Sequence, residues 1–304
     1  MSRKKRGSGF FASQWRLWVL LLPAFICLIL FKYVPMYGVS IAFKDVHIGQ
    51  SFLEGQWVGF KHFQRLFSSD IFKIIMKNTL SIAIIKNFVL WVLPILFALI
   101  VHNCRGKRLR KFTQTVSYMP HLVSTVVVVC IIDVFCNYES GLINIFSQQL
   151  GMKAIDFAGE GKWFLPMFFT SEVWASLGSE AVIYIAALSS VDTQLIEAAR
   201  MDGANKIQRI WHVDIPAILP TIVLVQIMNV GRFMSVGYEK ALLLQNDLNL
   251  EATEIIGTYV YKTGLQSMQY SFSAAVSLFN NVIGLILVLV ANFCAKKFTD
   301  SSLF

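Results

Sequence analysis

The residue types that carry catalysis are sparse in this sequence and form no catalytic pattern. Five histidines occur among 304 residues, and none belongs to an H-E-x-x-H motif or to a pair at metal-ligand spacing. The string GEGKW at 159–163 is the nearest approach to a phosphate-binding loop, but it lacks the G-x-x-x-x-G-K-[ST] spacing. No group of His, Cys, Asp or Glu offers a nucleophile, a base and an orienting residue together. We therefore expect no enzyme, and no metal or cofactor bound by this chain.

Other polar side chains interrupt stretches that are otherwise strongly apolar. Gln226, Asn229 and Arg232, for example, recur at i, i+3 and i+6. A charge at the centre of a bilayer costs about 2.5–3.5 kcal/mol on insertion scales, so such residues are candidates for the wall of a solute pathway. Alternatively, they only join one helix to another, as amide and small residues do in membranes. The candidates are Glu172, Trp174, Gln226, Asn229, Arg232, Phe233, Ser277, Asn280 and Asn281.

A third polar feature is the segment EAARMDGANKIQRIWHVDIP at 197–216, between two apolar stretches. Its first part predicts a helix at about 193–202, capped by Ser190 or Asp192 and ended by Gly203 in the left-handed conformation.

Its second part predicts another short helix, which Asn205 caps. Ile207, Ile210 and Trp211 would form an apolar face on it, and Pro216 would end the pattern or open the next helix.

Helices this short are marginal in isolation, so packing must hold them. Ala198, Ala199, Gly203 and Ala204 carry little or no side chain, which lets another surface approach the backbone closely. The segment is therefore either a docking surface for a partner or an amphipathic linker on the membrane interface.

The elements that position these residues follow from composition. With 56% hydrophobic residues, 15% charged residues and a mean hydropathy of +0.59, the chain is typical of an all-α membrane protein. A span needs about 20 mostly apolar residues. Six stretches qualify, at about 17–41, 79–101, 114–135, 163–188, 215–235 and 272–294.

Arginine and lysine cluster before the first stretch and between the second and third, which predicts that both clusters are cytoplasmic. They are Arg3, Lys4, Lys5, Arg6, Arg16, Arg105, Lys107, Arg108, Arg110 and Lys111. Both termini and residues 189–214 are then expected inside, and the loops 42–78, 136–162 and 236–271 outside. The net charge of +9 is explained by topology and by attraction to anionic membrane lipid, so no nucleic-acid partner is expected.

The polar segment resembles a known signature. Glu-Ala-Ala at 197–199, Gly203, and Val213, Ile215 and Pro216 resemble the EAA motif (E-A-A-x-x-x-G, later I-x-L-P) of binding-protein-dependent ABC importer permeases. Val213 and Ile215 replace the consensus isoleucine and leucine, a mild departure.

Further strings are similar to carbohydrate-type permeases, specifically LplB-like polysaccharide permeases related to the maltose permease MalF. They are SYMPHLVSTVVVVCIIDVF, GLIN, KNTL and the C-terminal YSFSAAVSLFNNVIGLILVLVANFCAKK. The resemblance covers residues 15–304 and includes no large extracytoplasmic insertion of the kind in MalF.

The resemblance implies a six-helix type I ABC importer permease fold with cytoplasmic termini in a cell membrane, importing oligosaccharides or polysaccharide fragments. It also implies that a separate ATPase, which binds the ATP and Mg, docks on a coupling segment. The matching residues are Glu197, Ala198, Ala199, Asp202, Gly203, Ala204 and Pro216. The implied partners are two ATPase subunits, a second homologous permease, expected to form a heterodimer, and an extracellular solute-binding protein.

The expected organisation is a basic cytoplasmic segment at 1–16, a permease domain at 17–297 with its coupling segment at 190–216, and a tail at 298–304. Two alternatives stay open at this point. One is an ABC permease for a non-sugar solute, and the other is a secondary transporter, although no repeated half is evident.

Overall fold

The computed structural model describes residues 15–299 apart from residues 48, 52, 53 and 105. Almost all of the basic segment 1–16 lies outside the described residues, as do Arg105 and residues 300–304 of the predicted tail. The described chain is mainly helical, as expected, and it departs from an all-α chain in one two-stranded hairpin. The chain forms two units: residues 1–67 with 263–278, and residues 68–262 with 279–304.

The first unit begins with an apolar helical stretch. α2 (Trp15–Leu28) continues into the π-helix η1 (Ile29–Tyr33) and the 3-10 helix η2 (Val34–Phe43). The most apolar 18-residue window within Leu17–Phe43 has a mean hydropathy of 2.4, and none of its residues is buried. Their side chains are therefore available to lipid or to another protein.

A small hairpin and a short helix follow in the same unit. β1 (Lys44–Asp45) pairs antiparallel with β2 (Gln56–Trp57), with Lys44 opposite Trp57. Lys61, the first residue of α3 (Lys61–Phe67), donates to the Asp45 carboxylate at 2.7 Å. The hydrogen bond from the Val46 N–H to the Ser271 hydroxyl, at 3.0 Å, ties the hairpin to the first turn of α15.

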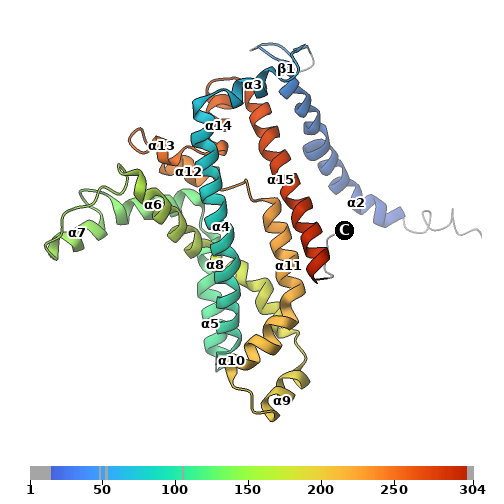
Figure 1. Cartoon of the computed structure of the whole chain (residues 1–304), viewed down its shortest axis with the longest axis vertical. Helices are drawn as coiled ribbons and strands as arrows, with labels where there is room; N and C mark the ends of the chain where they lie inside the picture. Colours follow the sequence, from blue (N-terminus) through green and yellow to red (C-terminus); the bar gives the residue numbers. More distant parts are fainter. Residues whose placement is uncertain (1–14, 48, 52–53, 105, 300–304) are drawn as a thin grey trace, which may run out of the picture. The chain divides into compact units, whose positions relative to one another are not determined.

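The second unit is built on long helices, of which α4 and α8 lie side by side (Figure 1). These helices are α4 (Asp70–His102), α8 (Phe164–Ser189), α11 (Ile215–Gly231) and the later part of α15 (Tyr270–Thr299). Leu99, Tyr184 and Ile218 form a buried cluster where α4, α8 and α11 meet, and Ile82 and Phe168 lie in a second cluster. Apolar packing thus holds both ends of the α4–α8 pair.

Helix α5 (Lys107–Tyr118) packs closely on α8, because Gly178 has no side chain. A Cβ on Gly178 would lie 2.1 Å from the Ser117 carbonyl oxygen. Small residues serve this purpose at helix crossings in membranes.

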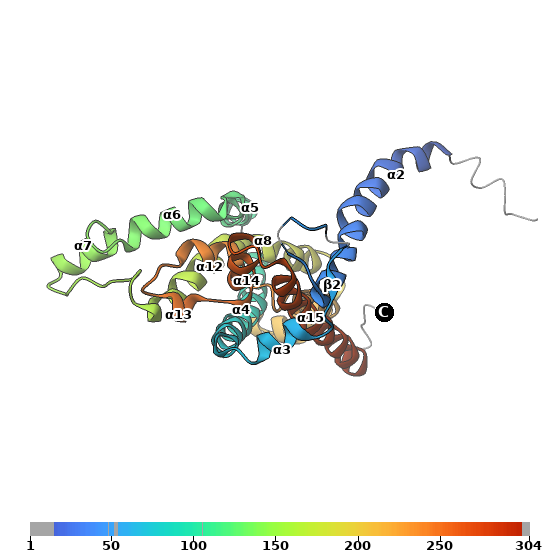
Figure 2. The ribbon, with the colours of Figure 1, turned by 90° about the horizontal axis from the view of Figure 1, so that it is seen from above.

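The predicted third span, 114–135, is not one straight helix. Residues 107–122 and α6 (Thr125–Cys136) are bent by 98° relative to each other; in Figure 2, α5 is seen nearly end-on whereas α6 runs across the view. Between them, η3 (Met119–Leu122) contains Pro120, and Ser124 takes an extended conformation and caps α6 by accepting from the Val127 N–H. Proline and a side-chain cap together start a new helix here.

Four described stretches are unbroken and apolar enough to cross a membrane, and two bent pairs raise this number to six. The unbroken stretches are Leu17–Phe43, Asp70–His102, Lys206–Gly231 and Tyr270–Lys297. The bent pairs are 107–122 with 125–136, and 161–189 with 193–201. Each of the six predicted stretches therefore coincides with helix over most of its length, two of them in bent pairs, and residues 123–124 and 232–235 are not helical.

The short elements of the second unit are mostly connections. They are α7 (Leu142–Gln149), η4 (Gly161–Trp163), α9 (Thr193–Met201), α10 (Lys206–Arg209), η5 (Ile210–Asp214), α12 (Tyr238–Leu244), α13 (Leu250–Thr253), α14 (Ile256–Tyr261) and η6 (Lys262–Gln266), which leads to the first unit. α9 and α10 lie at one end of this unit and α12–α14 at the other (Figure 1).

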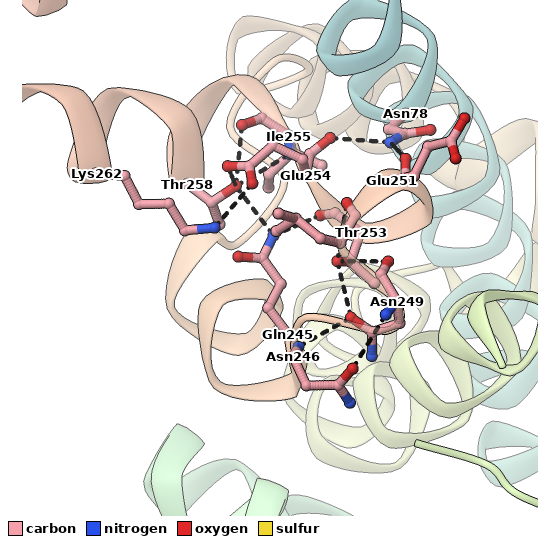
Figure 3. A network of polar contacts seen from close by, with 11 residues as sticks. Asn78, Gln245, Asn246, Asn249, Glu251, Thr253, Glu254, Ile255, Thr258 and Lys262 are labelled. Atoms are coloured by element: carbon pink, nitrogen blue, oxygen red, sulfur yellow. Dashed lines mark hydrogen bonds and ion pairs between the residues drawn. The ribbon is translucent and has the colours of Figure 1, made fainter. Parts of the chain in front are cut away.

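Side-chain amides and hydroxyls hold the connection 245–262 in place (Figure 3). Asn78 of α4 donates to the carbonyl oxygens of Glu251 and Glu254, at 2.9 and 3.0 Å. Within the connection, Thr258 donates to the Glu254 carboxylate at 3.0 Å, and Lys262 pairs with it at 2.8 Å. The connection is therefore an ordered part of the second unit.

Candidate functional site

The polar segment forms the two short helices that its sequence predicts. Asp192, one of the two predicted caps, accepts from the Gln194 N–H at 2.9 Å at the start of α9, whereas Ser190 ends α8. Gly203 has a φ of +80°, in the left-handed region that glycine adopts most easily. Asn205 forms a reciprocal capping box with Gln208 at the start of α10. The predicted break and both helices are confirmed.

The second short helix does not stop at Pro216. α10, η5 and α11 follow one another as one helical stretch from Lys206 to Gly231. Pro216 lies in the first turn of α11, directly after the π-helix η5. Pro216 therefore opens the next helix, one of the two predicted alternatives.

A buried ion pair anchors the segment to the end of α4. The Arg209 guanidinium lies 3.2 Å from the Asp214 carboxylate, and these side chains are 11% and 1% exposed. The same guanidinium donates to the amide oxygen of Asn103, the residue after α4. Sequence reasoning missed this anchor, although an aspartate directly before an apolar stretch was a signal for it. A displacement of α10 would therefore act directly on α4 and α11.

The outer face of the segment is open. Glu197, Ala198, Asp202, Gly203 and Pro216 are exposed, and Ala199 and Ala204 are half-buried. Four large apolar side chains on it are also exposed: Leu195, Met201, Ile207 and Trp211. Ile210, predicted to share a face with Ile207, instead packs against the core. Small and apolar side chains together make a surface suited to another protein.

A cavity of about 150 Å³ lies within the second unit, among α4, α8 and the end of α11. Its lining includes Glu172, Asn229, Arg232 and Phe233, four of the nine predicted pathway residues. Gln226 lies beside it and donates to Asn87, a lining residue, at 3.4 Å. Arg232 follows the last residue of α11 and is exposed, since the helix ends at Gly231 and not at about 235 as predicted.

The structure does not bring the other predicted pathway residues to this cavity. Trp174 lines an apolar groove with Val128 and Phe135 of α6, because two residues along a helix turn a side chain about 200° from Glu172. Asn280 and Asn281 on α15 are not among the lining residues, and Ser277 belongs to the first unit. Their place in the solute pathway stays a prediction.

Two lysines that the sequence did not point to lie against Glu172, and one of them lines the cavity. Lys86 of α4 lies 2.8 Å from one carboxylate oxygen of Glu172, and Lys240 of α12 lies 2.5 Å from the other. Lys86 and Glu180 line the cavity with Glu172. Lys86 could have been found, because it lies inside the predicted second span. Lys240 could not, because it lies in α12, between two predicted spans, and only the fold brings it to α8.

Comparison with known proteins gives one consistent result. Residues 91–299 match the family model described as the binding-protein-dependent transport system inner membrane component. The chain is 41% identical over 288 residues to the polygalacturonan/rhamnogalacturonan transport system permease protein YteP of Bacillus subtilis (strain 168), covering 95% of this chain and 90% of YteP. It is 38% identical to LplB of the same organism, covering 95% and 91%.

A solved structure is similar over nearly the whole chain. It is a chain of a bacterial alginate ABC transporter in complex with an alginate pentasaccharide-bound periplasmic protein. The TM-score is 0.90 at 32% identity, with 98% of this chain and 100% of the other covered.

Proposed function

Because this chain belongs to the binding-protein-dependent transport system inner membrane components, we propose that residues 197–216 are the joint through which a separate ATPase drives it. The chain is the permease component of an ABC importer for sugars or polysaccharides, and a multi-pass membrane protein. One observation carries the proposal: an exposed pair of short helices, hinged at Gly203, is tied by the buried Arg209–Asp214 pair to the ends of α4 and α11.

In the proposed mechanism, two ATPase subunits close around ATP and Mg and move α9 and α10. The anchor passes that movement to α4 and α11, whose side chains line the cavity, and the pathway changes from inward-open to outward-open. ATP must bind the two states with different affinity, because a ligand that binds both equally shifts nothing. Coupling is reciprocal, so a loaded binding protein outside favours closure of the ATPases inside.

The other proposed partners are a second permease, forming a heterodimer, and an extracellular solute-binding protein. The similar alginate transporter, in complex with a periplasmic protein, supports the latter. We place the α9–α10 end in the cytoplasm with both termini. Arg110, from the basic cluster, donates to Ser189 at the end of α8 at 3.0 Å, which supports one side for that cluster and the segment.

We propose oligosaccharides or polysaccharide fragments as the substrates, since YteP is named for polygalacturonan and rhamnogalacturonan transport. Glu172, Asn229, Arg232 and Phe233 would contact the substrate as it passes the cavity. Amide and charged groups donate and accept hydrogen bonds with sugar hydroxyls, and Phe233 adds an aromatic face.

The test is uptake by the complete complex in proteoliposomes that enclose ATP, with and without the ATPase subunits. We expect uptake of a radiolabelled oligogalacturonate only when the ATPase is present. Glu197→Lys should reduce uptake and ATPase co-purification, because it reverses the charge of the exposed residue that matches the family glutamate. Lys153→Glu, a charge reversal at an exposed residue outside the segment, is the matched control. Uptake that persists without the ATPase would indicate a secondary carrier instead.

A further inference from the structure

Glu172 is held between two lysines that differ in their access to the cavity. Lys86 Nζ lies 2.8 Å from Glu172 Oε1, and 25% of the Lys86 side chain is exposed. Lys240 Nζ lies 2.5 Å from Glu172 Oε2, and only 7% of its side chain is exposed. Lys240 is also 5.0 Å from the centre of the Phe168 ring, on the covered side. The carboxylate therefore has a lysine facing the cavity and a lysine behind it.

This cluster has one cation more than it has anions, two lysines against one glutamate. Arg232 and Glu180 line the same cavity and cancel in the charge sum. An uncompensated charge away from water is unfavourable, and it favours the binding of an anion. The extra positive charge is accessible to an anion at Lys86, because Lys240 is covered by protein.

Lys240 makes it feasible for Lys86 to leave the Glu172 carboxylate and bind a carboxylate of the substrate instead. Breaking a buried ion pair is costly mainly when it leaves one charge without a partner. If Lys86 turns away from Glu172, the carboxylate keeps Lys240. A second carboxylate can then take the place of Glu172 on Lys86, so one charge-assisted hydrogen bond replaces another.

We propose that Lys86 is a specificity-determining residue that selects anionic oligosaccharides, by exchanging Glu172 for a carboxylate of the sugar while Lys240 stays on Glu172. This inference rests on the proposed import of oligosaccharides. A neutral sugar offers only hydroxyl groups, which compensate an ammonium less well than a carboxylate does. Lys86 therefore stays on Glu172 when a neutral sugar is present, and the site discriminates against it.

The experiment compares two substrates of equal length: an oligogalacturonate and its methyl ester, which lacks the negative charges. Uptake of each is measured in proteoliposomes holding the complete complex, and the same binding protein is used throughout, so its own preference cancels between variants. We expect Lys86→Met to lower the ratio of acid to ester uptake about tenfold, the value of one charge-assisted hydrogen bond. Lys73→Met, the same change at an exposed position on α4 outside the cavity, should leave the ratio unchanged.

A second variant separates this role from a structural one. Glu172→Gln with Lys240→Met removes the inner ion pair as a whole, and of the three charges of this cluster only that of Lys86, the residue that faces the cavity, remains. Lys86 then no longer has the Glu172 carboxylate as a competitor of the substrate, and the ratio of acid to ester uptake should rise. This variant also decides the matter if Lys86→Met does not assemble.

An equal loss of acid and ester uptake in Lys86→Met would show a structural role and overturn the inference, as would a ratio that does not rise in the double variant. Both results leave oligosaccharide import itself standing. Failure of the unaltered complex to take up either substrate would overturn the proposed function and this inference together.

Discussion

At the scale of the residue, the buried carboxylate of Asp214 and the half-buried carboxylate of Glu172 each lie against basic side chains. Asp214 is 1% exposed beside the Arg209 guanidinium, and Glu172 is enclosed by Lys86 and Lys240. Such pairs are weak evidence for stability, because desolvation offsets much of their attraction. They do fix which helices meet: Arg209 and Asp214 connect α10 and η5 with Asn103 after α4. These ion pairs therefore matter more for the placement of the helices than for the free energy of unfolding.

The Arg209–Asp214 pair leads to a stability prediction. Arg209→Met leaves a buried carboxylate without its partner, which should destabilise the protein by about 3–5 kcal/mol. Arg209→Met with Asp214→Leu removes both charges and should recover most of that loss. The measurement is the thermal unfolding midpoint of the purified complex in detergent. If the double variant is as unstable as the single one, the loss comes from packing and not from an unpaired charge.

At the scale of the element, Gly203 separates α9 from α10 and lets them turn against each other. Its φ of +80° disfavours other residues, although a Cβ would meet no atom within 4 Å. Glycine is therefore favoured here by its backbone conformation, and not because a neighbouring element leaves no room for a side chain. Asparagine tolerates the left-handed region far better than a β-branched residue does.

The effect of a substitution at Gly203 should therefore depend on how well the new residue tolerates the left-handed conformation, and not on the size of its side chain. Gly203→Val should reduce ATPase co-purification and uptake, since the left-handed conformation costs roughly 1–2 kcal/mol for ordinary residues. Gly203→Asn, of similar volume, should retain most of both. Equal activity of the two variants would mean that the left-handed turn is not needed for coupling.

At the scale of the whole molecule, topology decides whether this joint can meet an ATPase. Met201 in α9 is 87% exposed, and Leu248, before α13, is 79% exposed. α9 and α13 lie at opposite ends of the second unit (Figure 1). The positive-inside rule assigns the α9 end to the cytoplasm.

Single cysteines introduced at these two positions test the assignment. In a background with Cys27, Cys104, Cys130, Cys136 and Cys294 replaced by serine, an impermeant maleimide added to intact cells should label Leu248→Cys. Met201→Cys should be labelled only after the membrane is opened. The reverse pattern would place residues 193–212 outside and exclude their docking to a cytoplasmic ATPase.

Local features of the chain were predictable from the sequence because each depends on nearby residues. The apolar stretches, the caps at Asp192 and Asn205, and the break at Gly203 follow from side-chain hydrophobicity and from backbone preference within a few positions. The bend at 123–124 also depends on nearby residues, Pro120 and Ser124. It was not predicted, because the third span was assigned from the length of its apolar stretch alone. The sequence therefore located the apolar stretches, but it did not predict the bend within the third.

What the sequence determined by itself is the class of the protein and its hinged polar segment, since hydrophobic length and glycine conformation are properties of short stretches. Only the tertiary structure decided which polar residues share a cavity. It brought Lys86, Glu172 and Lys240 together from α4, α8 and α12, and it turned Trp174 toward α6. The physical reason is that the side of a helix facing a partner depends on packing between segments far apart in the chain. No local pattern of polar residues encodes that choice.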